Sequence, residues 1–154
     1  ADQTARCGRQ TWFRRDGRNI PITEKTAIGR AIRMVPKLHA ENGGCSWNMT
    51  NGDMGGKPFC VVSVYREREL VLDSETIEPA ILNAYIGRNR DVLFKADHVM
   101  GTWVEDGKSY LDVSVLVGSR EEAQELCMLH GQLAYFDLET FETIESGYDR
   151  SKED

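Results

Sequence analysis

The chain has 154 residues, of which 40% are apolar and 29% are charged, a composition typical of a folded soluble protein. It is long enough to bury the core of one domain, and no apolar run reaches the roughly 18–20 residues of a membrane span. The net charge of −6 is uneven: residues 1–40 carry nine basic and three acidic side chains, whereas residues 105–154 carry four basic and thirteen acidic ones. An acidic chain disfavours a general nucleic-acid binder, because phosphates are repelled over most of its surface.

The N-terminal third predicts a basic arm, a hairpin and a helix. Residues 1–9 form a short, polar and basic segment, which is typical of a mobile arm. Asp16-Gly17 lies between two runs that contain apolar residues and predicts a tight hairpin turn, for which Pro21 favours an edge of the sheet. Apolar residues then recur at three- and four-residue steps, which predicts a helix over residues 24–37 that Pro36 bends or ends.

The middle of the chain predicts short strands followed by one helix. β-branched and aromatic residues indicate strands at 45–50 and 59–65, and residues 70–72 form a further short strand or an extended link. The helix that follows has Pro79 in its first turn and Gly87 as its stop.

The last third has the clearest pattern. Apolar and polar residues alternate at 109–117, and Asp106-Gly107 predicts a hairpin with the strand before it. Ser119 and Glu122 have the spacing of a capping box that begins a helix, and Gly131 supplies its left-handed stop. Two further strands follow, at residues 133–138 and 141–144.

Hairpins dominate this order of elements. We therefore expect an α+β fold, with a mostly antiparallel sheet built from hairpins and about three helices packed on it. The expected organisation is a mobile basic arm, a single α+β domain and a polar tail, at residues 1–9, 10–145 and 146–154.

The sequence contains only weak patterns for a metal site or for catalytic residues. The four cysteines contain no C-x-x-C pair, so we predict no metal site, and we expect no cofactor. We expect His39 to bond carbonyls at a helix end and His130 to lie on the inner side of the last helix. Cys127 and His130 have the i, i+3 spacing of a nucleophile and a base on one helix. A cysteine-dependent enzyme is thus the alternative to the non-enzymatic function that we expect.

Carboxylates gather in the last third, on elements that we expect to be neighbours in space. Clustered carboxylates can occupy a basic groove in place of nucleic-acid phosphates. We predict that such a surface binds a host protein with a basic nucleic-acid-binding groove, with the aromatic side chains of Trp103 and Tyr110 as anchors. The acidic surface consists of Glu105, Asp106, Glu121, Glu122, Glu125, Glu139, Glu142 and Glu145.

The basic N-terminal third supports a different hypothesis. Arginines mixed with aromatic residues are suited to gripping RNA or single-stranded DNA. The same arginines could instead solubilise an edge hairpin and pair with the acidic third of the chain. The candidate residues are Arg6, Arg9, Trp12, Arg14, Arg15 and Arg18.

Four segments of the chain together form a pattern: Gly101-Thr102-Trp103, residues 110–114, Glu121-Glu122-Ala123 and residues 132–138. In these segments, over roughly its last two-thirds, the chain resembles small uncharacterised proteins of bacteriophages and mobile elements. None of the segments brings a catalytic residue. The resemblance implies an anti-defence protein, such as an anti-CRISPR or anti-restriction protein, and a virion structural role fits the same context. The N-terminus lacks the apolar segment of a signal peptide, which predicts a protein in the cytoplasm of a bacterial host.

Overall fold

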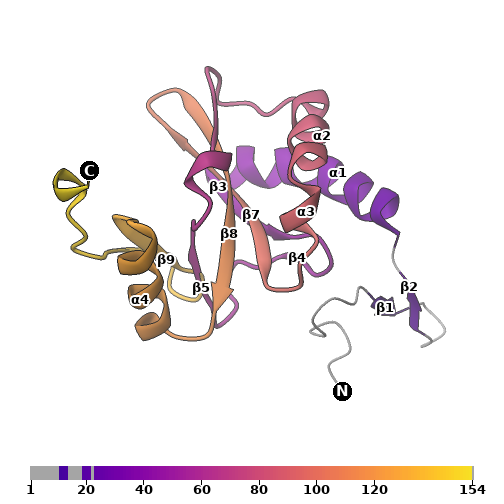
Figure 1. The fold of residues 1–154 in the computed structure, drawn as a ribbon. Coiled ribbons are helices and arrows are strands. Elements are labelled where there is room, and N and C mark those ends of the chain that lie inside the picture. The colour runs from indigo at the N-terminus through magenta and orange to yellow at the C-terminus, as the bar shows by residue number, and fades with distance from the viewer. Residues whose placement is uncertain (1–10, 14–18, 22, 154) are drawn as a thin grey trace.

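A computed structural model describes residues 11–13, 19–21 and 23–153 (Figure 1). Within these ranges, eight strands form one antiparallel sheet in the order β10-β9-β5-β8-β7-β3-β4, with β6 paired to β8. The predicted α+β fold with an antiparallel sheet is thus confirmed. The strands are β3 (Gly44–Asn48), β4 (Gly52–Asp53), β5 (Cys60–Val62), β6 (Leu70–Leu72), β7 (His98–Glu105), β8 (Lys108–Val117), β9 (Ala134–Asp137) and β10 (Glu142–Glu145).

Three helices of ten or more residues and one short helix occur in the described part of the chain. They are α1 (Glu24–Asn42), α2 (Pro79–Arg88), α3 (Arg90–Leu93) and α4 (Arg120–His130). Two short 3₁₀ turns accompany them, η1 (Arg66–Arg68) and η2 (Arg150–Lys152). The prediction of about three helices agrees with this arrangement.

The helices pack on one face of the sheet. Side chains alternate along β8, so Leu111 and Val113 point to the same face, where they pack with α1, α2 and α3. Val117 points the same way and packs with Cys127 of α4. On the other face, Val99 packs with loop residues such as Met54, within a third core cluster.

The N-terminal hairpin is separate from the main sheet. β1 (Thr11–Phe13) and β2 (Asn19–Pro21) pair antiparallel, as the Asp16-Gly17 signal predicts. They form a two-stranded sheet of their own, so the prediction that they lie at an edge of the main sheet is wrong. A turn signal determines how adjacent strands pair, whereas the sheet that they join depends on contacts distant in sequence.

The sequence predicts that Pro36 bends or ends the helix near Val35; α1 continues past Pro36 to Asn42, so the predicted ending is wrong. A proline inside a helix removes one backbone hydrogen bond. Buried side chains recur at four-residue steps on both sides of Pro36, at Ala27, Ala31, Val35 and His39. Their burial against the sheet holds the last turns of the helix in place despite the missing bond.

We expected His39 to bond carbonyls at the end of the helix, and this prediction is wrong. The side chain of His39 instead joins α1 to the sheet. It is 1% exposed, and its Nδ1 and Nε2 each lie 2.8 Å from a hydroxyl oxygen, of Thr102 on β7 and of Ser109 on β8. Burial lowers the pKa of the imidazole below its usual value. The ring is therefore a buried, neutral cross-link between a helix and two strands.

Replacing His39 with leucine is expected to lower the free energy of unfolding by about 2 kcal/mol, because two buried hydroxyls lose their partner. Urea unfolding measures this loss. The control is His39→Leu combined with Ser109→Ala, which leaves fewer polar groups unpaired and should recover part of the loss. A stability equal to that of the native protein in the single variant would contradict the cross-link.

The predicted polar tail packs against the domain. Ser146 is 8% exposed, and its hydroxyl donates to the carbonyl of Gln132. Arg150 donates to the carbonyl of Gly131, which ends α4, and Glu153 pairs with Arg66 of η1 at 3.1 Å. These bonds tie residues 146–153 to two separate elements.

Candidate functional site

The predicted acidic residues fall into two groups, so the expectation that they are neighbours is wrong. Glu105 and Asp106 lie at the turn between β7 and β8, whereas α4 begins after the far end of β8 (Figure 1). The ten residues of β8 separate these points by about 34 Å. A hairpin places its turn at one end of its strands and the next element at the other.

The second group forms an acidic end around α4, β9 and β10, which we define as Glu121, Glu122, Glu125, Glu139, Glu142 and Glu145. All six side chains are exposed. They come from the N-terminal half of α4, from β10 and, for Glu139, from the turn between β9 and β10. These elements are neighbours, because α4 contacts β5 and β9 while β10 pairs with β9. Folding therefore concentrates negative charge at one edge of the sheet.

Two of these glutamates already have a partner. Glu142 pairs with Arg120 at 2.9 Å, and the same guanidinium bonds the buried carboxylate of Asp137 at 2.8 Å. The hydrogen bonds from Arg120 lower the pKa of both carboxyl groups below their usual values. Glu122 accepts a hydrogen bond from Ser119 in the capping box. The carboxylates of Glu121 and Glu125 are thus more available to a partner than those of Glu122 and Glu142.

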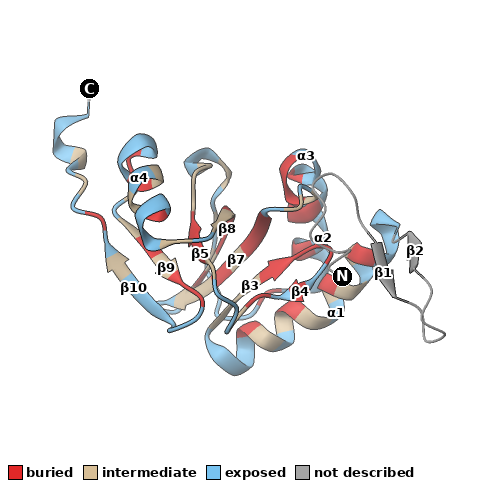
Figure 2. Cartoon of the chain, turned by 90° about the horizontal axis from the view of Figure 1, so that it is seen from below, coloured by how far each residue is buried: buried red, intermediate tan, exposed pale blue. Residues whose placement is uncertain are grey.

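The outer side of α4 is exposed (Figure 2), and exposed apolar residues continue it towards the end of the helix. Glu121 and Glu125 are followed at the next helical steps by Met128 and Leu129, which are 47% and 76% exposed. Leu133, just beyond the helix, is 47% exposed. This patch was not predicted, although four-residue steps from Glu121 through Glu125 to Leu129 place all three residues on one side of a helix.

The predicted nucleophile and base are not brought together. Cys127 is fully buried, and burial raises the pKa of its thiol above the usual value. His130 is exposed, so the expectation that it lies on the inner side of α4 is wrong. A thiol held protonated inside the core has little nucleophilic character.

The two predicted aromatic anchors lie far from the acidic end. Trp103 of β7 and Tyr110 of β8 are directly opposite in register, and their rings stack with centroids 5.1 Å apart and an angle of 5°. Both are half-buried, and neighbouring Val71 on β6 is 45% exposed. Because these rings lie near the β7–β8 turn, they cannot anchor a small partner that docks beside α4.

The candidate nucleic-acid residues are largely outside the described residues. This is the case for Arg6, Arg9, Arg14, Arg15 and Arg18. For Trp12 the structure describes a backbone position in β1, opposite Ile20. The hypothesis of an arginine-rich grip on RNA or single-stranded DNA therefore stays a prediction.

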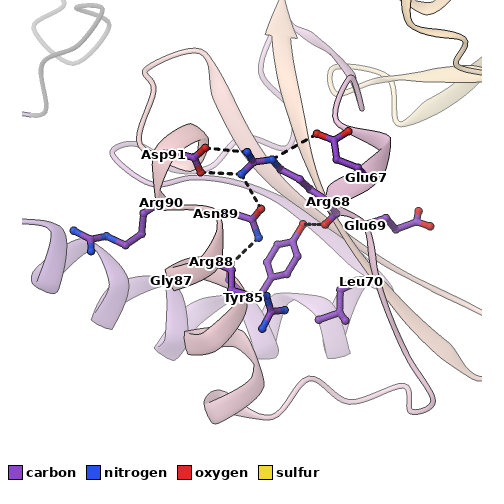
Figure 3. A pocket seen from close by; sticks show the side chains of 10 residues that line it. All are labelled: Glu67, Arg68, Glu69, Leu70, Tyr85, Gly87, Arg88, Asn89, Arg90 and Asp91. Atoms are coloured by element: carbon purple, nitrogen blue, oxygen red, sulfur yellow. Dashed lines mark hydrogen bonds and ion pairs between the residues drawn. The ribbon is translucent and has the colours of Figure 1, made fainter.

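A cleft of about 720 Å³ lies between η1, β6 and the end of α2 (Figure 3). Arg68 bonds both carboxylate oxygens of Asp91, at 2.8 and 2.9 Å, and the Oδ1 atom of Asn89 at 3.2 Å. The hydroxyl of Tyr85 donates to the carbonyl of Arg68. The polar groups that line the cleft therefore hydrogen-bond to one another. Its lining residues are Glu67, Arg68, Glu69, Leu70, Tyr85, Gly87, Arg88, Asn89, Arg90 and Asp91, with three cations and three anions.

A buried histidine network lies near this cleft. His98, at the start of β7, is 5% exposed, and its Nε2 lies 2.8 Å from the hydroxyl of Tyr65. Its Nδ1 lies 2.8 Å from a carboxylate oxygen of Asp97. This network was not predictable from residue spacing, because Tyr65 and His98 are far apart along the chain. It links the segment after β5 to the start of β7.

Comparison with protein-family models, with curated proteins and with solved structures gives no match for this chain. The resemblance to phage and mobile-element proteins therefore stays a prediction. In the described ranges, no group of three or more His, Cys, Asp or Glu residues is placed to hold a metal ion. None of the helices described above combines the length and the apolar character that a membrane crossing requires.

Proposed function

We propose that this chain is a non-enzymatic binding protein that docks its acidic end into the basic, nucleic-acid-binding groove of another protein. The observation that supports it is the outer side of α4, where exposed Glu121 and Glu125 are followed by exposed Met128 and Leu129. The phage resemblance suggests the partner's class: a host defence nuclease or a CRISPR effector, which the docked protein inhibits.

The two halves of this surface have different physical roles. Carboxylates steer a basic partner and accelerate association, an effect that salt screens. Apolar side chains that become desolvated in a complex slow dissociation, since their burial contributes about 25 cal/mol for each Å² removed from water. A basic groove with an apolar wall is the partner that complements both halves.

The test measures inhibition of purified CRISPR effectors and defence nucleases in DNA-cleavage assays. Glu121→Gln with Glu125→Gln should slow association and weaken its salt dependence, whereas Leu129→Ser should speed dissociation. The matched control is Glu105→Gln with Asp106→Asn, which removes the same charge at the other end of β8 and should inhibit like the native protein. Equal loss in both double variants would refute the choice of surface.

Three alternative functions remain predictions, and a different experimental result would favour each of them. Absence of inhibition across all effectors, together with recovery of the chain in purified phage particles, would replace the proposal with a virion structural role. Retention on RNA or single-stranded DNA that is lost when residues 1–18 are deleted would favour a nucleic-acid-binding accessory protein. A measured enzymatic activity that Cys127→Ser abolishes would favour the cysteine-dependent enzyme.

A further inference from the structure

The solvent side of α1 carries an excess of positive charge. Residues 25–40 contain four basic residues and no acidic one. Three of the four, Lys25, Arg33 and Lys37, are exposed and lie at steps of eight and four residues, on one side of the helix. We call these three residues the basic stripe. None of them forms a salt bridge with another described residue.

The side chains around the stripe do not cancel its charge. Glu24, in the first turn of α1, is engaged by Arg90 of α3. The fourth basic residue, Arg30, donates to the carbonyl of Thr50 and braces the helix against the loop after β3. Glu41, in the last turn of α1, is exposed and lies four residues after Lys37, on the same side of the helix. This one acid offsets at most one of the three positive charges, so the basic stripe keeps a net positive charge.

The sheet keeps the stripe away from the acidic end. α1 contacts β3 and β7, whereas α4 contacts β5 and β9. In the strand order, β3 and β9 are four strand spacings apart, which is about 19 Å. The Debye length is about 8 Å at physiological salt, so the carboxylates around α4 hardly weaken the potential at α1. A protein with net negative charge can therefore still present a surface that attracts anions.

From this arrangement we propose that the basic stripe binds the phosphate backbone of a single-stranded nucleic acid. The twelve residues from Lys25 to Lys37 rise about 18 Å, which matches about five phosphates at the stacked spacing of about 3.4 Å. Gly29 lies between Lys25 and Arg33, and no atom lies within 4 Å of where its Cβ would be, so a strand can approach the helix closely there.

The sequence before α1 favours a single strand over a duplex. β2 ends at Pro21, three residues before α1 begins at Glu24, so the N-terminal hairpin is tethered next to the stripe. That hairpin includes Trp12 and Phe13, residue types that stack on unpaired bases. This binding is independent of the proposed docking of the acidic end, because the two surfaces share no residue.

Fluorescence anisotropy with labelled oligo-dT and oligo-U of about 20 nucleotides tests the proposal, from about 50 to about 200 mM salt. Lys25→Gln, Arg33→Gln and Lys37→Gln in one chain should weaken binding at low salt by more than about tenfold. The slope of log affinity against log salt should fall in magnitude by about 2, since each phosphate contact on a single strand contributes about 0.7. The two oligonucleotides distinguish DNA from RNA as the ligand.

The matched control combines Lys57→Gln, Lys95→Gln and Lys152→Gln, three exposed lysines on other elements. It removes the same charge and should retain native affinity and slope. Equal weakening in both triple variants would show that only net charge matters and would overturn the proposal, as would native protein that binds neither oligonucleotide. Inhibition of a nuclease by the acidic end should persist in the stripe variant, so failures of the two proposals are distinguishable.

Discussion

Replacing Asp112 with asparagine is expected to remove a pH dependence of stability that the native protein shows between about pH 4 and pH 8. Asp112, in β8, is 6% exposed, and the hydroxyl of Ser114 donates to its Oδ1 at 3.2 Å. Desolvation raises the pKa of its carboxyl group from 3.8 to about 7. The unfolded chain releases this proton above about pH 4 and the folded chain only above about pH 7, so stability falls as the pH rises through this window.

The expected size is on the order of 4 kcal/mol at pH 8, since each pKa unit corresponds to about 1.4 kcal/mol. Urea unfolding of the native protein and of Asp112→Asn at about pH 5 and about pH 8 measures it. The imidazole of His39 titrates in both proteins, so its effect cancels in the comparison. A difference between the two proteins that stays the same at both pH values would show that Asp112 ionises normally.

Two glycine-to-alanine substitutions are expected to change stability in opposite directions. A Cβ on Gly44 would lie 2.4 Å from the carbonyl oxygen of Thr102 and 3.2 Å from the Cα of Trp103. Both are backbone atoms of β7, which is paired with β3, so the contact is relieved only by opening that pairing. Gly44→Ala should therefore destabilise the fold by on the order of 3 kcal/mol.

The matched substitution is Gly29→Ala, inside α1, where the added methyl group meets no atom within 4 Å. Alanine has the higher helix propensity, so this change should stabilise the protein by about 0.5–1 kcal/mol. Thermal or urea unfolding of both variants measures whether each substitution lowers or raises the free energy of unfolding. A small loss for Gly44→Ala, like that of an ordinary surface change, would mean that β3 and β7 pack less closely than the structure indicates.

Local features of the fold were predictable because a few adjacent residues determine them. Asp106 and Gly107 have φ angles of 52° and 77°, the positive values that the hairpin prediction requires. The Ser119 hydroxyl accepts from the backbone N–H of Glu122, as the capping box predicts, and Gly131 ends α4 with a φ of 68°. Turns and caps depend on bonds within four residues, so sequence spacing is sufficient to find them.

Features that depend on distant contacts were not predictable. α1 runs beyond Pro36 because His39 finds hydroxyl partners on β7 and β8, more than sixty residues away. The acidic residues separate because Glu105 and Glu121 follow opposite ends of β8. The exposed apolar patch at Leu129 was not predicted, because the apolar pattern of α4 was assigned to its inner side.

The position of β5 in the sheet affects how the protein folds while it is being synthesised. β5 lies between β8 and β9, and Val61 is opposite Leu116 on one side and Phe136 on the other. A nascent chain that has emerged only as far as α4 therefore leaves one hydrogen-bonding edge of the apolar segment Cys60–Val62 without its partner strand. Open apolar edges promote aggregation. We expect chains that terminate before β9 to accumulate as insoluble protein, whereas chains that include β9 close that edge.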